Sequence, residues 1–139
     1  MVCMKVFLSH ARKDAELARR LVDSLKRAGY SAWTAEQDID PGDNWARKIG
    51  DALDDSQLMV ILLTPGAIDS DPSLRRDIEF ALGSRHFEQR VFSVFVGPTL
   101  EAGKDLPWIL LKLPNRDVAS ASEFDDVVSE IQLAYPACA

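Results

Sequence analysis

Cysteine is scarce in this chain of 139 residues, which has only Cys3 and Cys138, close to its two ends. Two cysteines so far apart have no metal-ligand spacing, and one pair does not make a disulfide framework. The simplest interpretation is a protein of the reducing cytoplasm, with a disulfide between the two ends as the open alternative.

Long apolar runs are absent, and Lys5 already interrupts the first residues. A signal peptide or a membrane span would need a longer uninterrupted apolar segment. We therefore predict a cytoplasmic protein without direct membrane contact. Any membrane targeting would have to come from a partner or from a further segment.

Basic residues are outnumbered, with 16 Lys and Arg against 22 Asp and Glu and a net charge of -6. A nucleic-acid-binding surface needs clustered Lys and Arg, so we predict no nucleic-acid partner. Apolar residues make up 47% and charged residues 27% of the sequence, as in ordinary globular proteins. The length suits one domain with a sizeable core.

Glycine-rich phosphate loops, metal-binding motifs and nucleophile elbows are also missing from the sequence. Three carboxylates gather in one short segment, at Asp38, Asp40 and Asp43. They have no further ligand spacing, so a solvated loop is favoured over a cation site. We predict no metal and no bound cofactor.

The most apolar stretch covers residues 58–64 and ends at Pro65 and Gly66. Such a β-branched run is typical of a strand that is buried on both faces in a parallel sheet. Asp71 then offers a helix cap, and Pro72 suits the first helical position because no amide is needed there. Ligands bind beyond the carboxyl ends of such central strands, so an active site is expected here.

Strands and helices alternate along the rest of the chain. Helix signals are a cap at Asp14 with a stop at Gly29, a start near Trp45, and a capping box at Ser120 and Glu123. Residues 36–44 carry the turn formers of an exposed loop. The expected strands cover residues 6–8, 31–34, 58–64, 91–96 and, more weakly, 109–111. The alternation predicts an α/β, flavodoxin-like three-layer fold with a central five-stranded parallel sheet of order 2-1-3-4-5.

Two families with this architecture do not fit. A phosphate-accepting receiver domain needs an acidic pair after the first strand and an aspartate at the end of the third. This chain has Ser9-His10 and Thr64-Pro65 there. A flavin-binding domain needs a Ser/Thr/Gly-rich loop after the first strand, and residues 10–13 are His-Ala-Arg-Lys.

Four short segments, taken together, resemble a Toll/interleukin receptor (TIR) domain of the bacterial kind. They follow the family order over almost the whole chain, which predicts a single TIR domain over residues 1–139. The segments are Val6-Phe7-Leu8-Ser9-His10-Ala11 with Asp14, Gly29-Tyr30-Ser31-Ala32-Trp33, Asp38-Ile39-Asp40-Pro41-Gly42 with Trp45, and Leu62-Leu63-Thr64-Pro65-Gly66-Ala67.

The resemblance implies one of two activities. Many TIR domains are NAD nucleosidases, which cleave the bond between nicotinamide and ribose, so NAD is the candidate substrate. In these enzymes a glutamate on the helix after the third strand stabilises the charge that develops on the ribose, as in glycoside cleavage generally. Other TIR domains are scaffolds that only pair with further TIR domains.

Alignment through Arg75-Arg76 places the family's glutamate on Asp77, and the aromatic residue often found one turn earlier on Ser73. Both are departures from the family pattern. Glu79 would lie beyond the opposite border of the helix's buried stripe, so it is not expected to replace Asp77.

Asp77 keeps the charge but is shorter by one methylene, and misplacement of about 1 Å can cost on the order of a hundredfold in rate. The alternative is an exposed carboxylate near a helix N-terminus, where the helix dipole favours it. The residues leave both interpretations of Asp77 open.

Further nucleotide contacts are implied by the resemblance. The alternatives are that His10 packs at a strand end and that Trp45 anchors the core. Residues 36–44 match the family's BB loop, which closes over the site and inserts into a neighbouring protomer. The candidate contacts are Ser9, His10, Ala11, Arg12, Ile39, Gly42, Trp45 and Ser73.

Two hypotheses follow from the sequence. The first is a bacterial immune or signalling NAD nucleosidase that is active once assembled, with Asp77 as its carboxylate. The second is a non-catalytic module that binds other TIR domains or a nucleotide signal. The first requires hydrolysis that depends on Asp77, whereas the second requires only association through the BB loop. A sensor or effector is a possible further partner for either.

Overall fold

A computed structural model describes residues 4–97 and 107–137 of the chain. Its five strands form one sheet in the order β2-β1-β3-β4-β5, and every neighbouring pair is parallel. The predicted strand order is therefore confirmed. The strands are β1 (Lys5–Ser9), β2 (Ser31–Trp33), β3 (Leu58–Leu63), β4 (Val91–Val96) and β5 (Asn115–Val118).

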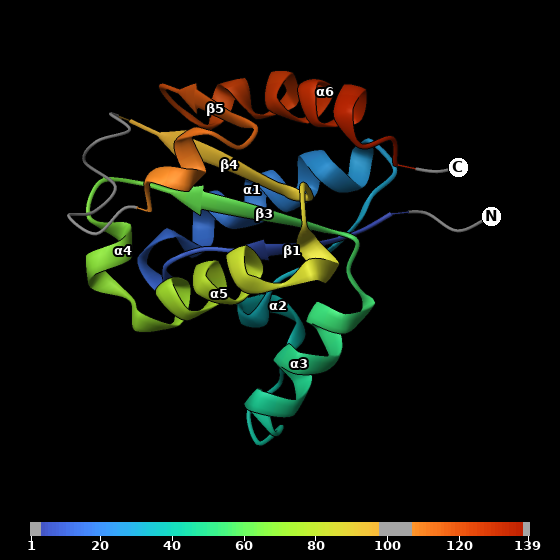
Figure 1. Cartoon of the computed structure of the whole chain (residues 1–139), viewed down its shortest axis with the longest axis vertical. Coiled ribbons are helices and arrows are strands. Elements are labelled where there is room, and N and C mark those ends of the chain that lie inside the picture. The colour runs from blue at the N-terminus through green and yellow to red at the C-terminus, as the bar shows by residue number, and fades with distance from the viewer. Residues whose placement is uncertain (1–3, 98–106, 138–139) are drawn as a thin grey trace.

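Helices cover both faces of the sheet, α1 and α6 on one face and α3, α4 and α5 on the other (Figure 1). The α-helices are α1 (Ala15–Arg27), α2 (Ala35–Asp38), α3 (Trp45–Asp55), α4 (Ala67–Ser70), α5 (Pro72–Gly83) and α6 (Phe124–Ala134). Short 3₁₀ helices are η1 (Arg12–Asp14), η2 (Arg85–Phe87), η4 (Trp108–Leu111) and η5 (Ala121–Glu123). None of the described helices is long and apolar enough to span a bilayer.

The central strand β3 is buried along its whole length, with no residue more than 1% exposed. Its side chains alternate between two hydrophobic clusters, one beneath α1 and α6 and the other beneath α5. Leu58, Val60 and Leu62 belong to the first cluster, and Met59, Ile61 and Leu63 to the second. The prediction of a strand that is buried on both faces is confirmed.

Both ends of α1 show how local signals compete with tertiary contacts. Gly29, with φ of +100°, ends the helix as expected, and the amide of Tyr30 donates back to the carbonyl of Leu25. Asp14 stands at the expected N-cap position of α1, but its side chain makes no hydrogen bond to the helix and so does not cap it. Its carboxylate instead accepts a 2.6 Å hydrogen bond from the hydroxyl of Thr64, and both residues are buried.

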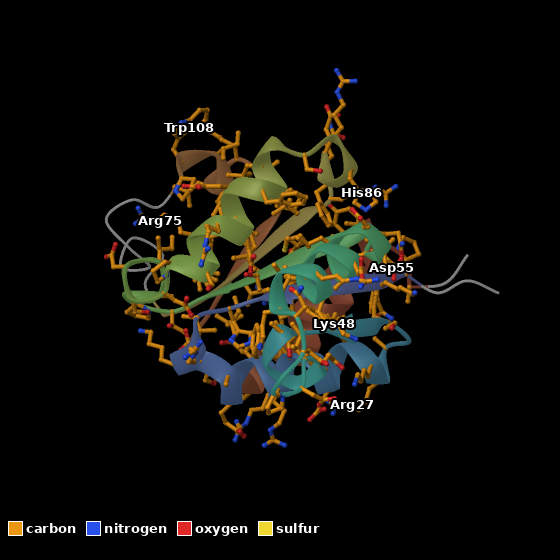
Figure 2. All side chains as sticks on the ribbon, turned by 90° about the horizontal axis from the view of Figure 1, so that it is seen from below. Arg27, Lys48, Asp55, Arg75, His86 and Trp108 are labelled. Carbon is orange, nitrogen blue, oxygen red and sulfur yellow. The ribbon has the colours of Figure 1, made fainter. Side chains whose placement is uncertain are left out.

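The fifth strand does not lie at residues 109–111, as the sequence predicts, but at Asn115–Val118. The apolar run forms the 3₁₀ helix η4, in which Leu110 is fully buried while Trp108 is 70% exposed and points away from the molecule (Figure 2). One buried residue per three-residue turn suits that helix. As an edge strand, β5 pairs only with β4 and does not need an apolar sequence.

The segment 36–44 is less open than predicted. Its first part belongs to the short helix α2, and Ile39 is only 6% exposed. A turn follows in which Gly42 has φ of +95° and the amide of Asp40 donates to Asp43. Asn44 then caps α3 by accepting a hydrogen bond from the amide of Arg47. Cys3 and Cys138 lie outside the described residues.

The bond between Thr64 and Asp14 yields a first prediction. Thr64→Val removes the hydroxyl with little change of shape and leaves a buried carboxylate without this donor, which should lower the free energy of unfolding by about 1–3 kcal/mol. Thr64→Ser keeps the hydroxyl and should cost clearly less. Urea unfolding of both variants measures the difference, and equal losses would contradict the assigned role of the bond.

Candidate functional site

A hollow of about 60 Å³ lies beyond the carboxyl end of β1, beside the first turns of α5. In the strand order 2-1-3-4-5 this is where the connections of β1 and β3 diverge, the usual ligand position in open parallel sheets. Its lining residues are Phe7, Leu8, Ser9, His10, Arg12, Ala35, Trp45, Ile49, Asp71, Ser73 and Asp77.

Asp77 is one of the ionisable groups that line this hollow. It lies on α5, is half-buried, and accepts a 2.8 Å hydrogen bond from the hydroxyl of Ser9 at the end of β1. Burial raises the pKa of Asp77 to about 6, the Ser9 hydrogen bond opposes that rise, and the charge of Asp71 adds to it. Asp77 is therefore mainly ionised at pH 7 but close to its titration range.

Asp71 contacts both walls of the hollow. One carboxylate oxygen accepts a 2.9 Å hydrogen bond from the amide of Ser73, which confirms the predicted cap of α5. The other oxygen accepts a 2.9 Å hydrogen bond from the amide of Arg12. The sequence gives no signal for this second bond, because its partners are 59 residues apart.

The loop after β1 is held by further contacts. Nδ1 of His10 lies 2.7 Å from the carbonyl oxygen of Ala11, and a carbonyl can only accept, so Nδ1 carries the hydrogen. The ammonium of Lys13 donates to the carbonyl of Pro65 in the loop after β3. Two loops that are distant in sequence, those after β1 and β3, are thus joined.

The structure brings together six of the nine predicted site residues. Ser9, His10, Arg12, Trp45, Ser73 and Asp77 all line the hollow. The other three do not, because Ala11 and Ile39 are buried in the protein and Gly42 lies in the exposed turn before α3.

Glu79 lies apart from this group. It is exposed and lines a different small hollow, with Ile68, Ile78 and Pro107 among its neighbours. This placement agrees with the helical spacing, which puts Glu79 beyond the opposite border of the buried stripe. Glu79 is therefore a suitable control for substitutions of Asp77.

The hollow is narrow. Its volume equals that of about two water molecules in the liquid, so a nucleotide does not fit between these walls as they stand. Trp45, at the start of α3, is 42% exposed and also lines the hollow.

Much larger hollows lie elsewhere among the described residues. One of about 280 Å³ is lined by Lys5 and Ser31, the first residues of β1 and β2, together with Lys48 and Asp55 of α3. Another of about 370 Å³ is lined by Met4 and Arg90, just before β1 and β4. The second lies at amino ends of strands, and the first runs along the edge strand β2 from Ser31 to Trp33. We favour the smaller hollow as the functional site because it lies at the carboxyl end of β1, where ligands usually bind. In residues 4–97 and 107–137 no group of three or more His, Cys, Asp or Glu is placed to hold a metal.

A family model of the TIR domain matches residues 6–126. The TIR domain of the Toll-related receptor TRR-2 from Hydra magnipapillata is similar, with 19% identity, a TM-score of 0.69, and coverage of 91% of this chain and 97% of that one. A flavodoxin mutant from Pseudomonas aeruginosa matches with 14% identity, a TM-score of 0.58, and coverage of 94% and 98%.

A metazoan TIR-STING receptor from C. gigas, solved in complex with 2',3'-cGAMP, matches with 20% identity, a TM-score of 0.66, and coverage of 91% of this chain. The match spans only 38% of that receptor. No curated protein matches the sequence. At these identities the solved structures show the fold.

The raised pKa of Asp77 leads to a second prediction. The folded-state pKa of about 6 exceeds the ordinary value of 3.8, so ionisation of Asp77 costs stability progressively as pH rises from about 4 to above 6. Asp77→Asn removes this cost and should gain on the order of 2 kcal/mol relative to the wild type between pH 4 and pH 8. Urea unfolding of the wild type and the variant at pH 4 and at pH 8 measures this gain in stability.

The matched control is Glu79→Gln, which removes an exposed carboxylate from the same helix outside the hollow. If the stability difference between Asp77→Asn and the wild type does not change with pH, ionisation of Asp77 has no cost in the folded protein.

Proposed function

The chain belongs to the TIR domain family, and we propose that it is a signalling NAD nucleosidase that cleaves the nicotinamide–ribose bond when copies assemble. The observation that carries the proposal is Asp77, a half-buried carboxylate with a pKa of about 6 in a hollow at the carboxyl edge of the sheet. Perturbed acids in such hollows are characteristic of functional sites.

The chemistry requires a carboxylate beside the ribose carbon that loses nicotinamide. The electron pair of the broken bond leaves with nicotinamide, which departs neutral, and positive charge develops on the ribose. Ionised Asp77 stabilises this charge, and the Ser9 hydroxyl holds the carboxylate in place. Water then adds to the ribose carbon and gives its proton to Asp77.

Other residues of the hollow suit a nucleotide. Arg12 is exposed at the mouth and can pair with a phosphate, and His10 lies between it and Ser9. The exposed ring of Trp45 offers a stacking surface. Because the hollow holds only about two water volumes, we propose that assembly through segment 36–44 moves the α3 side and admits NAD.

Partners and location belong to the same proposal. A second copy is the proposed partner for assembly, and a sensor or effector domain is the proposed trigger. The TIR-STING receptor, of which this chain matches 38%, carries a TIR domain within a longer protein. A cytoplasmic location would give access to NAD and suits a chain with two cysteines.

The second candidate is a non-catalytic TIR module. Two observations favour it. Positions 77 and 73 hold an aspartate and a serine, where the resemblance implies a glutamate and an aromatic residue. The hollow is also small. In that case segment 36–44 would act in association only. Release of nicotinamide separates the two candidates.

The third prediction concerns that release. Concentrated wild-type protein with a crowding agent should release nicotinamide from NAD, and Asp77→Ala should abolish it. Asp77→Glu should keep activity or raise it, because the added methylene restores the family's side-chain length. Chromatographic detection of nicotinamide is the measurement. If none of the three proteins releases nicotinamide while the wild type self-associates, the nucleosidase function is overturned and the non-catalytic TIR module is favoured.

The fourth prediction concerns pH. Only the ionised form of Asp77 stabilises a positive ribose, so the rate should fall about tenfold per pH unit below pH 6 and level off above it. Initial rates of nicotinamide release between pH 4.5 and pH 8 give the profile. Glu79→Gln should show the same profile, and a rate independent of pH across this range would exclude Asp77 as the titrating group.

A further inference from the structure

One carboxylate, that of Asp71, joins the two chain segments that carry the site. One of its oxygens accepts the amide of Ser73 in the first turn of α5, and the other accepts the amide of Arg12 in the loop after β1. Both distances are 2.9 Å. A helix cap alone would occupy only one oxygen, so this carboxylate does more than start α5.

The loop after β1 is also joined to the loop after β3, at two points. The ammonium of Lys13 contacts the carbonyl of Pro65, and Thr64 donates its hydroxyl to Asp14. Of these tethers, Asp71 is the one whose residue lines the hollow together with Asp77. The loop after β1 is therefore held to α5 at the wall of the site itself.

Fixing these two segments also fixes the bond between Ser9 and Asp77. Ser9 directly precedes the held loop, and Asp77 lies on the helix that Asp71 caps. The Ser9–Asp77 distance of 2.8 Å therefore depends on how the loop and the helix sit against each other. The charged groups that act on Asp77 are Asp71, Arg76 and His10.

We propose that Asp71 is a positioning residue for Asp77, which holds the loop after β1 against α5 so that Ser9 keeps the Asp77 carboxylate oriented into the hollow. Asp71 acts through these bonds and without contact to the substrate. Its consequence for catalysis rests on the proposed NAD nucleosidase function, whereas the positioning itself is a property of the free protein.

Two substitutions separate this role from simple capping. Asn and Ser are both good helix caps, so Asp71→Asn and Asp71→Ser should preserve the bond to the Ser73 amide and the fold. Ser is too short to accept from both amides, and Asn would present its NH₂ group to the Arg12 amide, where no bond can form. Both variants also remove the charge beside Asp77.

The control is Asp69→Asn, which also removes a carboxylate from this region. Asp69 lies 3.8 Å from the guanidinium of Arg75 and does not line the hollow. Asp69→Asn should leave the solvent exchange of the Arg12 amide and the titration of Asp77 unchanged.

NMR on the free protein tests the proposal. In both Asp71 variants the Arg12 amide should exchange with solvent about tenfold faster, as expected for loss of a charge-assisted hydrogen bond, while the Ser73 amide stays protected. If Asp71 positions Asp77 through Ser9, the carboxyl carbon of Asp77 should titrate at higher pH than in the wild type, because the Ser9 bond lowers the pKa of Asp77 more than the charge of Asp71 raises it. Wild-type exchange at Arg12, or a titration of Asp77 that is unchanged or moves to lower pH as removal of the charge alone would cause, would overturn the proposal.

Nicotinamide release distinguishes failure of this inference from failure of the proposed function. The Asp71 variants should lose about tenfold or more in kcat with less change in KM, since the carboxylate is misplaced. If amide exchange at Arg12 and the titration of Asp77 change as expected but the wild type releases no nicotinamide, the NAD function is overturned and the positioning role is retained. An active wild type whose Asp71 variants keep its full rate and pH profile would overturn the positioning role and leave the function standing.

Discussion

Burial of β3 on both faces is the constraint on which the rest of the molecule depends. A strand whose side chains alternate between two hydrophobic clusters needs helices on both sides, so its connections must cross over the sheet. The parallel crossovers bring the loops after β1 and β3 to one edge. That edge holds Ser9, Thr64 and Asp71 together, and the site is a consequence of the core beneath it.

Electrostatics at this edge act against stability. Asp71 and Asp77 place like charges around one hollow, and burial adds to the cost of ionising Asp77. The fold offsets this with hydrogen bonds to the carboxylates from the hydroxyl of Ser9 and from the backbone amides of Ser73 and Arg12. Perturbed acids of this kind are common at functional sites, and the proposed function assigns its carboxylate to Asp77 for this reason.

The packing of α5 against β1 suits the short side chain of Asp77. A side chain shorter than glutamate still forms a 2.8 Å bond to Ser9, because α5 lies directly against β1. The same closeness leaves a hollow of only about 60 Å³. The closeness of α5 and β1 therefore accounts for both the hydrogen bond of the short acid and the small volume of the hollow.

Local signals in the sequence determined the elements that depend on neighbouring residues: the apolar run of β3, the Gly29 stop of α1, the Asp71 cap and the resulting strand order. They misplaced β5, because an edge strand at Asn115–Val118 needs no apolar pattern. Only the tertiary structure decided where Asp14 and the second oxygen of Asp71 find partners, since those bonds join residues 50 and 59 positions apart. It also decided which candidate residues share one hollow, because that depends on how the loops pack around the core and not on local spacing.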